Sequence, residues 1–488
     1  MRYEKVAVAV FSSRTRNFKL KTMKRRKFIK TSAVGAAAIS VPLILNAKIK
    51  GANDRVRVGV IGIHGMGQNH IKEYLALNNV EVVAICDVDQ NLYPEVIKKH
   101  FTDNGIKRPD TYVDMRDLYD DKSIDAVSVV TPNHWHALAA VWAMQAGKHV
   151  SVEKPCCYNI YEGQKLLEAS KKYNVIVQDG AEQRNNPAAQ SAAEFLHSGQ
   201  LGEVYLAKGI CYKWRDTIGR YPDGPIPDGS THPKGSFTKK YLSKVNYDMW
   251  LGPAPKRPFN PNRFHYNWHW NFDYGNGDMG NQGIHELDVA RWGLGVKLPT
   301  RITTMGGHFM FDDAQNTPNT LMALFEFPNE AATGDKKKIL QFEVRHWISN
   351  REVWLGDDNS DSSGYMKSAS NTIGNLFYGS KGYMAKNVDK WQTYMGKERE
   401  LGASGSGLAN NYKNFIDTIR ANNPSMLSAK IEDGVYSTAV MHLGNIAYQL
   451  GRSLDFDPET MKFKNDDEAN DLISRPEYRK PFVFPENV

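Results

Sequence analysis

The chain has 488 residues and a formal net charge of +8, with 24% charged and 41% hydrophobic residues. This length predicts two or three domains, and the composition is that of a globular protein rather than a disordered or fibrous one. Residues 1–50 hold thirteen Lys and Arg but one acidic residue, so the other 438 residues carry 49 basic and 53 acidic groups, a net charge of −4. The positive charge is confined to the N-terminus, so it gives no argument for binding nucleic acid.

The basic N-terminus has the pattern of an export signal. A cationic run at 23–30 precedes an apolar stretch at 31–45 that is too short, and too rich in Ala and Gly, for a comfortable membrane span. The pair Arg25-Arg26 resembles the twin-arginine signal, which exports proteins already folded. We expect residues 1–47 to be an N-terminal extension with this signal peptide, and the mature protein to be periplasmic without a stable membrane span. A retained basic anchor helix is the alternative.

The first predicted domain, residues 54–178, begins with a dinucleotide-binding pattern. An apolar run at 55–61 ends at a glycine cluster that leads into a helical pattern, and a second apolar run at 80–86 ends on Asp87. Strand, glycine turn, helix, strand and acid is the order of a Rossmann unit. The candidate cofactor residues of the turn are Gly62, His64, Gly65, Met66 and Gly67.

The residues of this pattern have separate physical tasks. Gly62 permits a tight turn, and Gly67 brings a helix N-terminus with free amides close to the pyrophosphate. His64 stands where a second glycine would normally let the backbone approach the phosphates. Asp87 is predicted to accept hydrogen bonds from the adenosine ribose diol and to repel a 2′-phosphate, which favours NAD over NADP. An Asp that only forms a turn is the alternative.

Two further predicted strands, at 125–130 and 149–152, each end in a short polar motif. The first is followed by Thr131-Pro132-Asn133 and His136, and the second by Glu153-Lys154-Pro155. A Rossmann fold binds its ligand at the carboxyl ends of such strands. We therefore add to the candidate cofactor site Thr131, Pro132, Asn133, His136, Glu153 and Lys154.

These motifs together resemble the family of glucose-fructose oxidoreductase and inositol dehydrogenase, called Gfo/Idh/MocA. The resemblance extends through most of the chain after residue 54. It implies an α/β fold in which the Rossmann domain precedes a C-terminal α+β domain with a large open, mainly antiparallel sheet. We expect this second domain to span residues 179–488, with its last helices packed back on the Rossmann domain, and the chain to form a homo-oligomer through the sheet.

The residue patterns of the second half fit such a domain. Strands are predicted at 205–211, 301–310, 321–327, 338–344 and 382–385, and amphipathic helices at 408–419 and 433–450. Residues 214–256 are rich in Pro, Gly, Lys and Asp and are predicted to form a surface insertion over the cleft. A surface loop with no role at the cleft is the alternative. The last residues, which include Pro481 and Pro485, are expected to form a tail.

An aromatic segment, residues 263–274, contains six aromatic residues and two histidines. Flat apolar faces beside hydrogen-bonding groups suit a sugar, although a corner of aromatic core is the alternative. His265 and His269 have helical i, i+4 spacing, but no motif supplies further ligands, so no metal is predicted. The secondary candidates for the substrate site are Arg184, Trp268 and His269, and Gln183 is a further candidate for the cofactor site.

The resemblance also implies a catalytic group. In the family an Asp and, four residues later, a His act with the lysine of Glu-Lys-Pro; Lys154 and His285 match, whereas Asn281 stands at the Asp position. Asn281 and His285 are also candidates to contact the substrate. Asp278 and Asp288 are candidate replacements for the missing carboxylate. We expect Lys154 to polarise the substrate oxygen or relay its proton, and His285 to act as base or acid.

The sequence therefore predicts an NAD-dependent oxidoreductase acting on a secondary hydroxyl of a sugar, cyclitol or glycoside. An exported enzyme has no pool of NAD to exchange with, so the cofactor is expected to stay bound and to be reset within the site. The first alternative is NAD-dependent glycoside hydrolysis through a transient 3-keto intermediate. The second is a non-catalytic protein that binds a sugar or the cofactor, which the departure at Asn281 permits.

Overall fold

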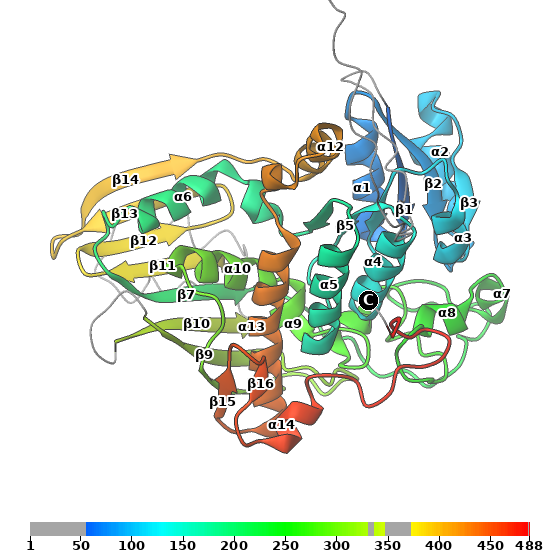
Figure 1. Cartoon of the computed structure of the whole chain (residues 1–488). Helices are drawn as coiled ribbons and strands as arrows, with labels where there is room; N and C mark the ends of the chain where they lie inside the picture. The colour runs from blue at the N-terminus through cyan, green and yellow to red at the C-terminus, as the bar shows by residue number, and fades with distance from the viewer. Residues whose placement is uncertain (1–54, 330–335, 347–371, 487) are drawn as a thin grey trace, which may run out of the picture. The chain divides into compact units, whose positions relative to one another are not determined.

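The computed structural model describes residues 55–329, 336–346, 372–486 and 488, which belong to one compact unit, Lys48–Val488 (Figure 1). The predicted export signal at 1–47 lies outside the described residues. Among the helices that are described, none combines the length and the apolar composition that crossing a membrane requires.

The N-terminal domain is built on a parallel sheet of six strands in the order β3-β2-β1-β4-β5-β6. The strands are β1 (Val56–Ile61), β2 (Val80–Cys86), β3 (Asp110–Tyr112), β4 (Ala126–Val129), β5 (His149–Val152) and β6 (Val177–Asp179). Its central strands are apolar runs because helices cover both faces of the sheet. The strand order reverses between β1 and β4, which is where such sheets bind a ligand.

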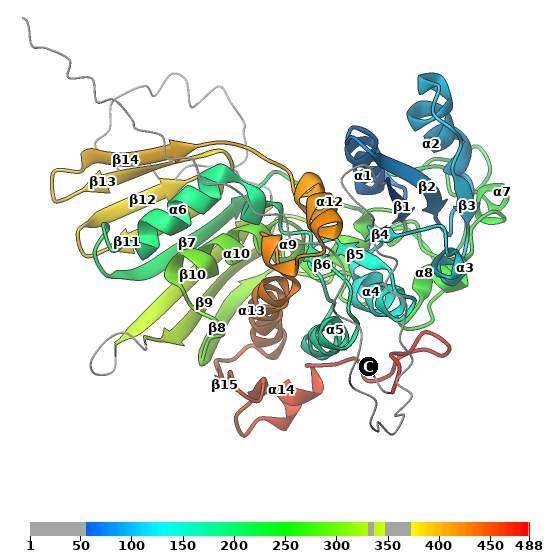
Figure 2. The same cartoon turned by 45° about the horizontal axis from the view of Figure 1, so that its top comes forward.

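The helices that connect these strands are α1 (Gly65–Leu75), α2 (Tyr93–His100), α3 (Met115–Asp120), α4 (His136–Gln145) and α5 (Ile160–Lys172). α4 is buried along almost its whole length, and its sequence HALAAVWAMQ is accordingly apolar on every side. Two helices from the end of the chain join this layer: α12 (Tyr412–Ala421) packs against α1, and α13 (Ile431–Leu450) against α5 (Figure 2).

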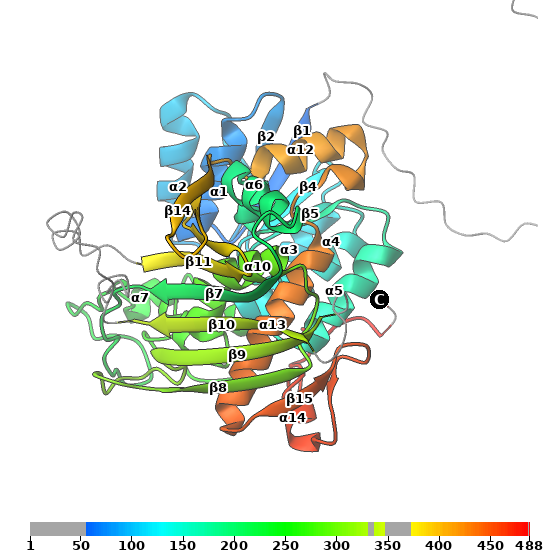
Figure 3. The same cartoon turned by 90° about the vertical axis from the view of Figure 1, so that its left-hand side faces the viewer.

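The C-terminal domain is built on a second sheet, to which the described residues contribute ten strands in the order β14-β13-β12-β11-β7-β10-β9-β8-β15-β16 (Figure 3). They are β7 (Val204–Tyr212), β8 (Arg301–Gly307), β9 (Thr320–Pro328), β10 (Lys337–Arg345), β11 (Thr372–Gly379), β12 (Gly382–Lys386), β13 (Lys390–Met395), β14 (Glu400–Ser406), β15 (Leu454–Asp457) and β16 (Lys462–Phe463). Within the described residues β7 and β10 pair in parallel and the other pairs are antiparallel. The predicted fold class is confirmed.

Helices α6 (Pro187–His197), α10 (Gly283–Leu294) and α13 cover one face of this sheet. α10 lies very close to it: a Cβ on Gly283 would be 2.2 Å from the ring of Phe342, and one on Gly293 would be 2.4 Å from the ring of Phe377. On the other face several large apolar side chains are exposed. They are Met305, Met322, Leu324 and Ile339.

The end of the chain does not form the expected tail. Its phenylalanines alternate with other residues and so point to one side, where Phe482 packs on Trp135 and Phe484 on Tyr161, with ring centroids 5.3 and 6.0 Å apart. Before them lies the short helix α14 (Asp467–Asp471). The segment is therefore part of the core beside α4 and α5.

The insertion at 214–256 has a small core of its own. It contains the short helices α7 (Lys239–Leu242) and α8 (Tyr247–Leu251). Phe237, Trp250 and Leu251 pack with the buried aromatic residues Phe264 and Tyr274 of the next segment. The insertion is therefore an ordered element of the C-terminal domain rather than a surface loop without a core.

Candidate functional site

A cleft of about 320 Å³ lies at the carboxyl ends of β1, β2, β4 and β5. All the cofactor candidates taken from the sequence except Gln183 line it: Gly62, His64, Gly65, Met66, Gly67, Asp87, Thr131, Pro132, Asn133, His136, Glu153 and Lys154. The C-terminal domain contributes the facing wall, which consists of Trp250, His265, Tyr266, Trp268, His269 and Asn281. The cleft thus brings both halves of the sequence together.

The glycine turn has the geometry that a pyrophosphate requires. Gly62 has φ +84°, a left-handed conformation that favours glycine. A Cβ on Gly67 would lie 1.8 Å from the carbonyl oxygen of Gly62, so only glycine lets α1 begin against the turn. The first amides of α1 are consequently free at the cleft, and the residues present fit a dinucleotide.

Asp87, at the end of β2, is fixed by backbone amides. Its carboxylate accepts hydrogen bonds from Ile63 N and Asp89 N, both at 2.9 Å. Burial raises the pKa of this carboxyl, and these amides oppose that rise. Each oxygen keeps a further lone pair, so the carboxylate can still accept hydrogen bonds from a ribose diol.

The side chains of His136 and Asn133 form hydrogen bonds that fix the loops around the cofactor site. The two ring nitrogens of His136 lie 2.7 Å from Thr131 O and from Pro155 O, so one imidazole joins the loops that follow β4 and β5. Asn133 Nδ2 donates to Asn276 Oδ1 at 3.0 Å, which joins the first of these loops to the C-terminal domain.

Lys154 leaves β5 and crosses to the other domain. Its Nζ donates to the backbone carbonyl of Asn281 at 2.6 Å, at the end of the short helix α9 (Gly277–Asn281). The preceding residue, Glu153, is buried and lies 3.0 Å from His70 Nε2. Burial would raise the pKa of Glu153, but the contact with His70 and the nearby Lys154 lower it to about 2. Glu153 is therefore ionised beneath the lysine.

Asn281 is held by Asp278, the nearer of the two candidate carboxylates. Asn281 Nδ2 donates to Asp278 Oδ1 at 3.2 Å, and Arg215 binds both oxygens of Asp278 at 2.8 Å. His346 Nε2 lies 3.1 Å from the same carboxylate. Burial alone would raise the pKa of Asp278, but Arg215 and His346 hold it well below its usual range.

His285 lies on the first turn of α10 and is not among the residues that line the cleft. Its Nδ1 is buried and finds no hydrogen-bond partner among the described residues. Burial and the positive charge of Lys154 lower its pKa to about 3, so the imidazole is neutral at neutral pH. The imidazole therefore has one unprotonated nitrogen, although a pKa this low makes it a weak base.

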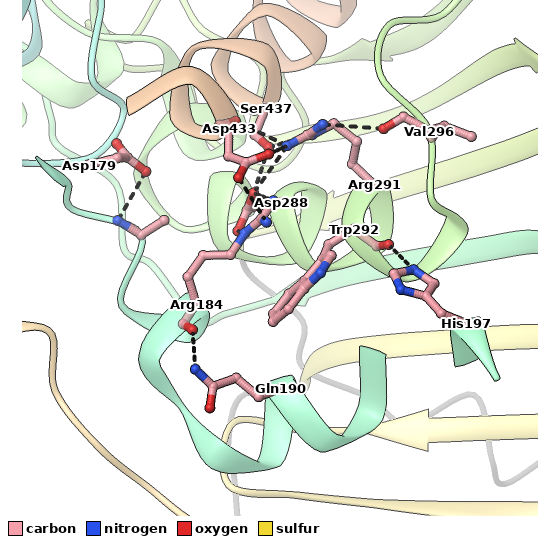
Figure 4. Close-up of polar contacts among 11 residues, drawn as sticks. Asp179, Arg184, Gln190, His197, Asp288, Arg291, Trp292, Val296, Asp433 and Ser437 are labelled. Atoms are coloured by element: carbon pink, nitrogen blue, oxygen red, sulfur yellow. Dashed lines mark hydrogen bonds and ion pairs between the residues drawn. The ribbon is translucent and has the colours of Figure 1, made fainter. Parts of the chain in front are cut away.

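Arg184 does not lie in the cleft, which corrects its assignment as a substrate residue. Its guanidinium binds Asp288 through two hydrogen bonds of 2.7 and 2.8 Å and lies 4.6 Å from the centroid of the Trp292 ring (Figure 4). Arg291 donates to Asp433 at 3.0 Å in the same cluster. Arg184 and Asp288 are both buried, and Asp288 also accepts a hydrogen bond of 2.6 Å from the Ser437 hydroxyl. Asp288 therefore cannot replace a carboxylate at Asn281.

Gln183 is likewise outside the cleft wall. Its Oε1 accepts a hydrogen bond of 3.1 Å from Lys386 Nζ on β12. Both residues are buried, and Lys386 lies beside Glu286 of α10. Gln183, in the segment that follows β6, consequently contacts the C-terminal sheet instead of a cofactor in this cleft.

The aromatic segment 263–274 divides into a core part and a cleft part. Phe264, Trp270 and Tyr274 are buried. Trp268 and His269 stack on one another, with centroids 3.6 Å apart, and both line the cleft. Part of the segment is therefore aromatic core, and sugar binding by Trp268 and His269 stays a prediction. No trio of His, Cys, Asp or Glu in the described residues is arranged to hold a metal ion.

Three residues of the facing wall are not among the individual site residues predicted from the sequence: Trp250, Tyr266 and His265. The aromatic density of 263–274 was the available signal for Tyr266. Nothing local indicated that Arg215 would hold Asp278, because these residues are 63 positions apart.

Two family models match the chain. The one described as "Oxidoreductase family, NAD-binding Rossmann fold" matches residues 56–181. The one described as "Oxidoreductase family, C-terminal alpha/beta domain" matches residues 234–305 and 378–484.

Curated relatives match a shorter stretch. A glycosyl hydrolase family 109 protein of Shewanella pealeana is 31% identical over 171 residues, which is 31% of this chain and 37% of that protein. Inositol 2-dehydrogenase of Salmonella typhimurium is 30% identical over 159 residues, which is 32% of this chain and 46% of that enzyme. The matched stretch thus spans less than half the length of these relatives.

Solved structures share the fold over most of the chain. Levoglucosan dehydrogenase in complex with NADH has a TM-score of 0.58 at 18% identity and covers 82% of this chain and 99% of its own. Aldose-aldose oxidoreductase from Caulobacter crescentus has a TM-score of 0.57 at 16% identity and covers 82% of this chain and all of its own. Since the two family models together cover more than half of the sequence, the chain belongs to the Gfo/Idh/MocA family of oxidoreductases, with an NAD-binding Rossmann domain.

Proposed function

We propose that the protein is an NAD-dependent oxidoreductase that acts on a secondary hydroxyl of a sugar, cyclitol or glycoside. The observation that carries this proposal is one cleft in which Lys154 and a dinucleotide cradle face Trp268, His269 and Asn281. Stacking surfaces beside hydrogen-bonding groups suit a ring with a C–H face and hydroxyls.

The cofactor would be held by the turn at Gly62 and Gly67, the free amides of α1 and the carboxylate of Asp87. When bound, NAD supplies a nicotinamide C4 that accepts a hydride from the carbinol carbon, and NADH supplies the same hydride in reverse. The loops joined by His136 form the floor of the site.

The chain's own residues must take the hydroxyl proton as the hydride leaves. The Lys154 ammonium, held by Asn281 O at 2.6 Å, can bind and polarise the substrate oxygen. His285, which burial and Lys154 keep neutral, is the candidate acceptor of that proton by relay. Asp278 keeps the loop at Asn281 in place through its hydrogen bond to the side-chain amide.

Two measurements test this function. Mass spectrometry of the nucleotide released on denaturing the purified protein is expected to find NAD; finding neither NAD nor NADP would overturn the proposal. Purified protein with candidate glycosides and a carbonyl acceptor is then expected to form a keto sugar.

A second candidate is glycoside hydrolysis without net redox change, because several relatives are named as glycosyl hydrolase family 109 proteins. A C3 hydroxyl would lose a hydride and a proton to give a 3-keto sugar, and the acidified neighbouring C–H would then lose its proton as the glycosidic bond breaks. Water adds to the resulting double bond, and hydride and proton return to C3. Release of aglycone without any acceptor would favour this route over simple oxidation, whereas accumulation of keto sugar would exclude it.

Export belongs to the same proposal, with Arg25-Arg26 as its support. An enzyme outside the cytosol must keep its NAD bound and return the hydride within the same site. Fractionation of cells expressing the full chain tests this: the protein is expected in the periplasm, and Arg25→Lys with Arg26→Lys is expected to retain it inside.

We also propose that two copies associate through the exposed face of the C-terminal sheet. Met305 and Met322 pair across β8 and β9, and Leu324 and Ile339 extend this apolar surface over β9 and β10. Met322 is 50% exposed and Met305 75% exposed in a single chain, which favours an interface. Light scattering is expected to find an oligomer, and Met322→Lys with Leu324→Glu is expected to shift it to a monomer.

A further inference from the structure

His64 occupies the position at which a dinucleotide turn normally has its second glycine, and its ring must be accommodated. The ring stacks on His265 of the aromatic segment, with centroids 4.5 Å apart and planes within 10°. Both rings line the cleft. The stack therefore places the side chain of His64 against the facing domain.

His265 is fixed from behind by a buried carboxylate. His265 Nε2 lies 2.7 Å from Asp89 Oδ2, and Asp89 is fully buried. The hydroxyl of Tyr241, in α7 of the insertion, donates to the same carboxylate and lies 3.3 Å from His265 Nε2. His265 has φ +61°, a left-handed conformation that few residues other than glycine adopt, so these contacts hold it in a costly backbone state.

The insertion is also joined to the loop after β2 by its backbone. Gln90 N donates to Lys244 O at 3.0 Å, and Asn246 N donates to Val88 O at 2.9 Å. This loop begins at Asp87, the predicted partner of the adenosine ribose. The insertion is therefore attached to the Rossmann domain beside Asp87, on the predicted adenosine side of the cleft. A second contact between the domains, the stack of His64 on His265, lies at the glycine turn.

We propose that the insertion is a cover that retains the dinucleotide, and that the stack of His64 on His265 is the contact that closes it over the pyrophosphate. The proposal rests on the proposed function, since it requires a dinucleotide in the cleft. His265 is accordingly a positioning residue: it holds His64 and the cover in place, and Asp89 and Tyr241 hold His265.

The decisive measurement is the rate at which NADH leaves the protein. It is monitored as the decrease in the fluorescence of bound NADH after mixing with excess NAD, which is not fluorescent. His265→Ala is expected to release NADH about three- to tenfold faster, as the loss of one aromatic contact implies. His64→Gly, which changes an exposed residue to the one usual at this place, is expected to have a similar effect. His197→Ala, at an exposed histidine of α6, is the control and is expected to leave the rate unchanged.

The pair must also act as a unit. In the His64→Gly background, His265→Ala is expected to add little, because the stack is already absent; multiplied effects would overturn the assignment of the stack. Single variants that release NADH at the wild-type rate would overturn the cover. A wild-type protein that binds no NADH would instead overturn the proposed function, and the cover with it. The melting temperature of each variant is measured without nucleotide. A variant that melts at the wild-type temperature is folded, so a change in its NADH release is not caused by misfolding.

Discussion

The two walls of the cleft are built in different ways. The Rossmann wall consists of short loops that follow consecutive parallel strands, so residues such as Gly62, Asp87 and Lys154 reach the cleft by the topology of one sheet. The facing wall is assembled from Trp250, His269 and other residues of irregular segments, which long-range contacts hold in place. The first wall therefore tolerates little change in its backbone, whereas the position of the second wall depends on contacts between distant segments.

The largest effect is expected where the Rossmann wall contributes to chemistry. Lys154→Ala should lower kcat by about 100- to 10,000-fold, the usual effect of losing a positioned acid–base group. NADH affinity should change much less, since the glycine turn and Asp87 are intact.

Lys165→Ala, on the outer side of α5 where the lysine pairs with Glu168, is the matched control. It should retain wild-type turnover. A Lys154→Ala protein with turnover within tenfold of the wild type would show that the lysine is not part of the reacting group.

The next effect concerns backbone geometry in the same wall. Gly67→Ala places a Cβ where Gly62 O lies 1.8 Å away, so the turn must deform; we expect a loss of about 1–3 kcal/mol in the free energy of unfolding and weak NADH binding. Gly65→Ala meets no atom of the described residues within 4 Å and should leave the melting temperature of the nucleotide-free protein unchanged. Equal melting temperatures for the two variants would contradict this account of the turn.

A smaller effect is expected in the facing wall at Asn281. Asn281→Asp introduces a carboxylate where the amide now donates to Asp278 at 3.2 Å, and two adjacent carboxylates raise the pKa of one of them. Turnover should be lower by roughly tenfold at alkaline pH and recover as the pH falls, because the introduced carboxyl group, once protonated, can donate as the amide does.

Asn271→Asp is a suitable control, since the Asn271 side chain accepts a hydrogen bond from Asp273 N, which a carboxylate also does. Its pH–rate profile should match that of the wild type. If Asn281→Asp has that same profile, Asp278 does not hold residue 281 in the working enzyme.

The smallest effect lies outside both walls. Burial lowers the pKa of His442 in α13 from 6.5 to about 4, so between these values the unfolded chain binds a proton that the folded chain does not. The free energy of unfolding therefore decreases as the pH falls from about 6.5 to about 4. His442→Gln removes this contribution, and its melting temperature should fall less than that of the wild type between about pH 7 and about pH 5. A parallel fall in both proteins would contradict the assigned neutral state.

The sequence was sufficient where the determining signals are local. The segments Val80–Cys86 and His149–Val152 are strands β2 and β5 with the predicted bounds, because short segments rich in valine favour a buried strand. The polar residues after each strand line the cleft. By contrast, β14 (ELGASGS) is mostly exposed and carries no apolar pattern, so it was not foreseen.

Distant pairings account for the errors at the site. Arg184 looked free for a substrate, but its partner Asp288 lies 104 positions later in the chain. Gln183 accepts a hydrogen bond from Lys386, which is 203 positions away. His265 contacts Asp89, which is 176 positions away. Residue type and spacing cannot reveal such partners, because the folded domains alone bring them together.

The buried pair of Arg184 and Asp288 has a consequence for how sequences of this family can diverge. A change at either residue alone leaves an uncompensated charge in the interior, which typically destabilises a protein by about 3–5 kcal/mol, whereas joint replacement by well-packed apolar residues can be neutral. Ancestors carrying only half of such a replacement would rarely survive selection. We therefore expect positions 184 and 288 to covary among relatives, so that an alignment would record their contact without any structure.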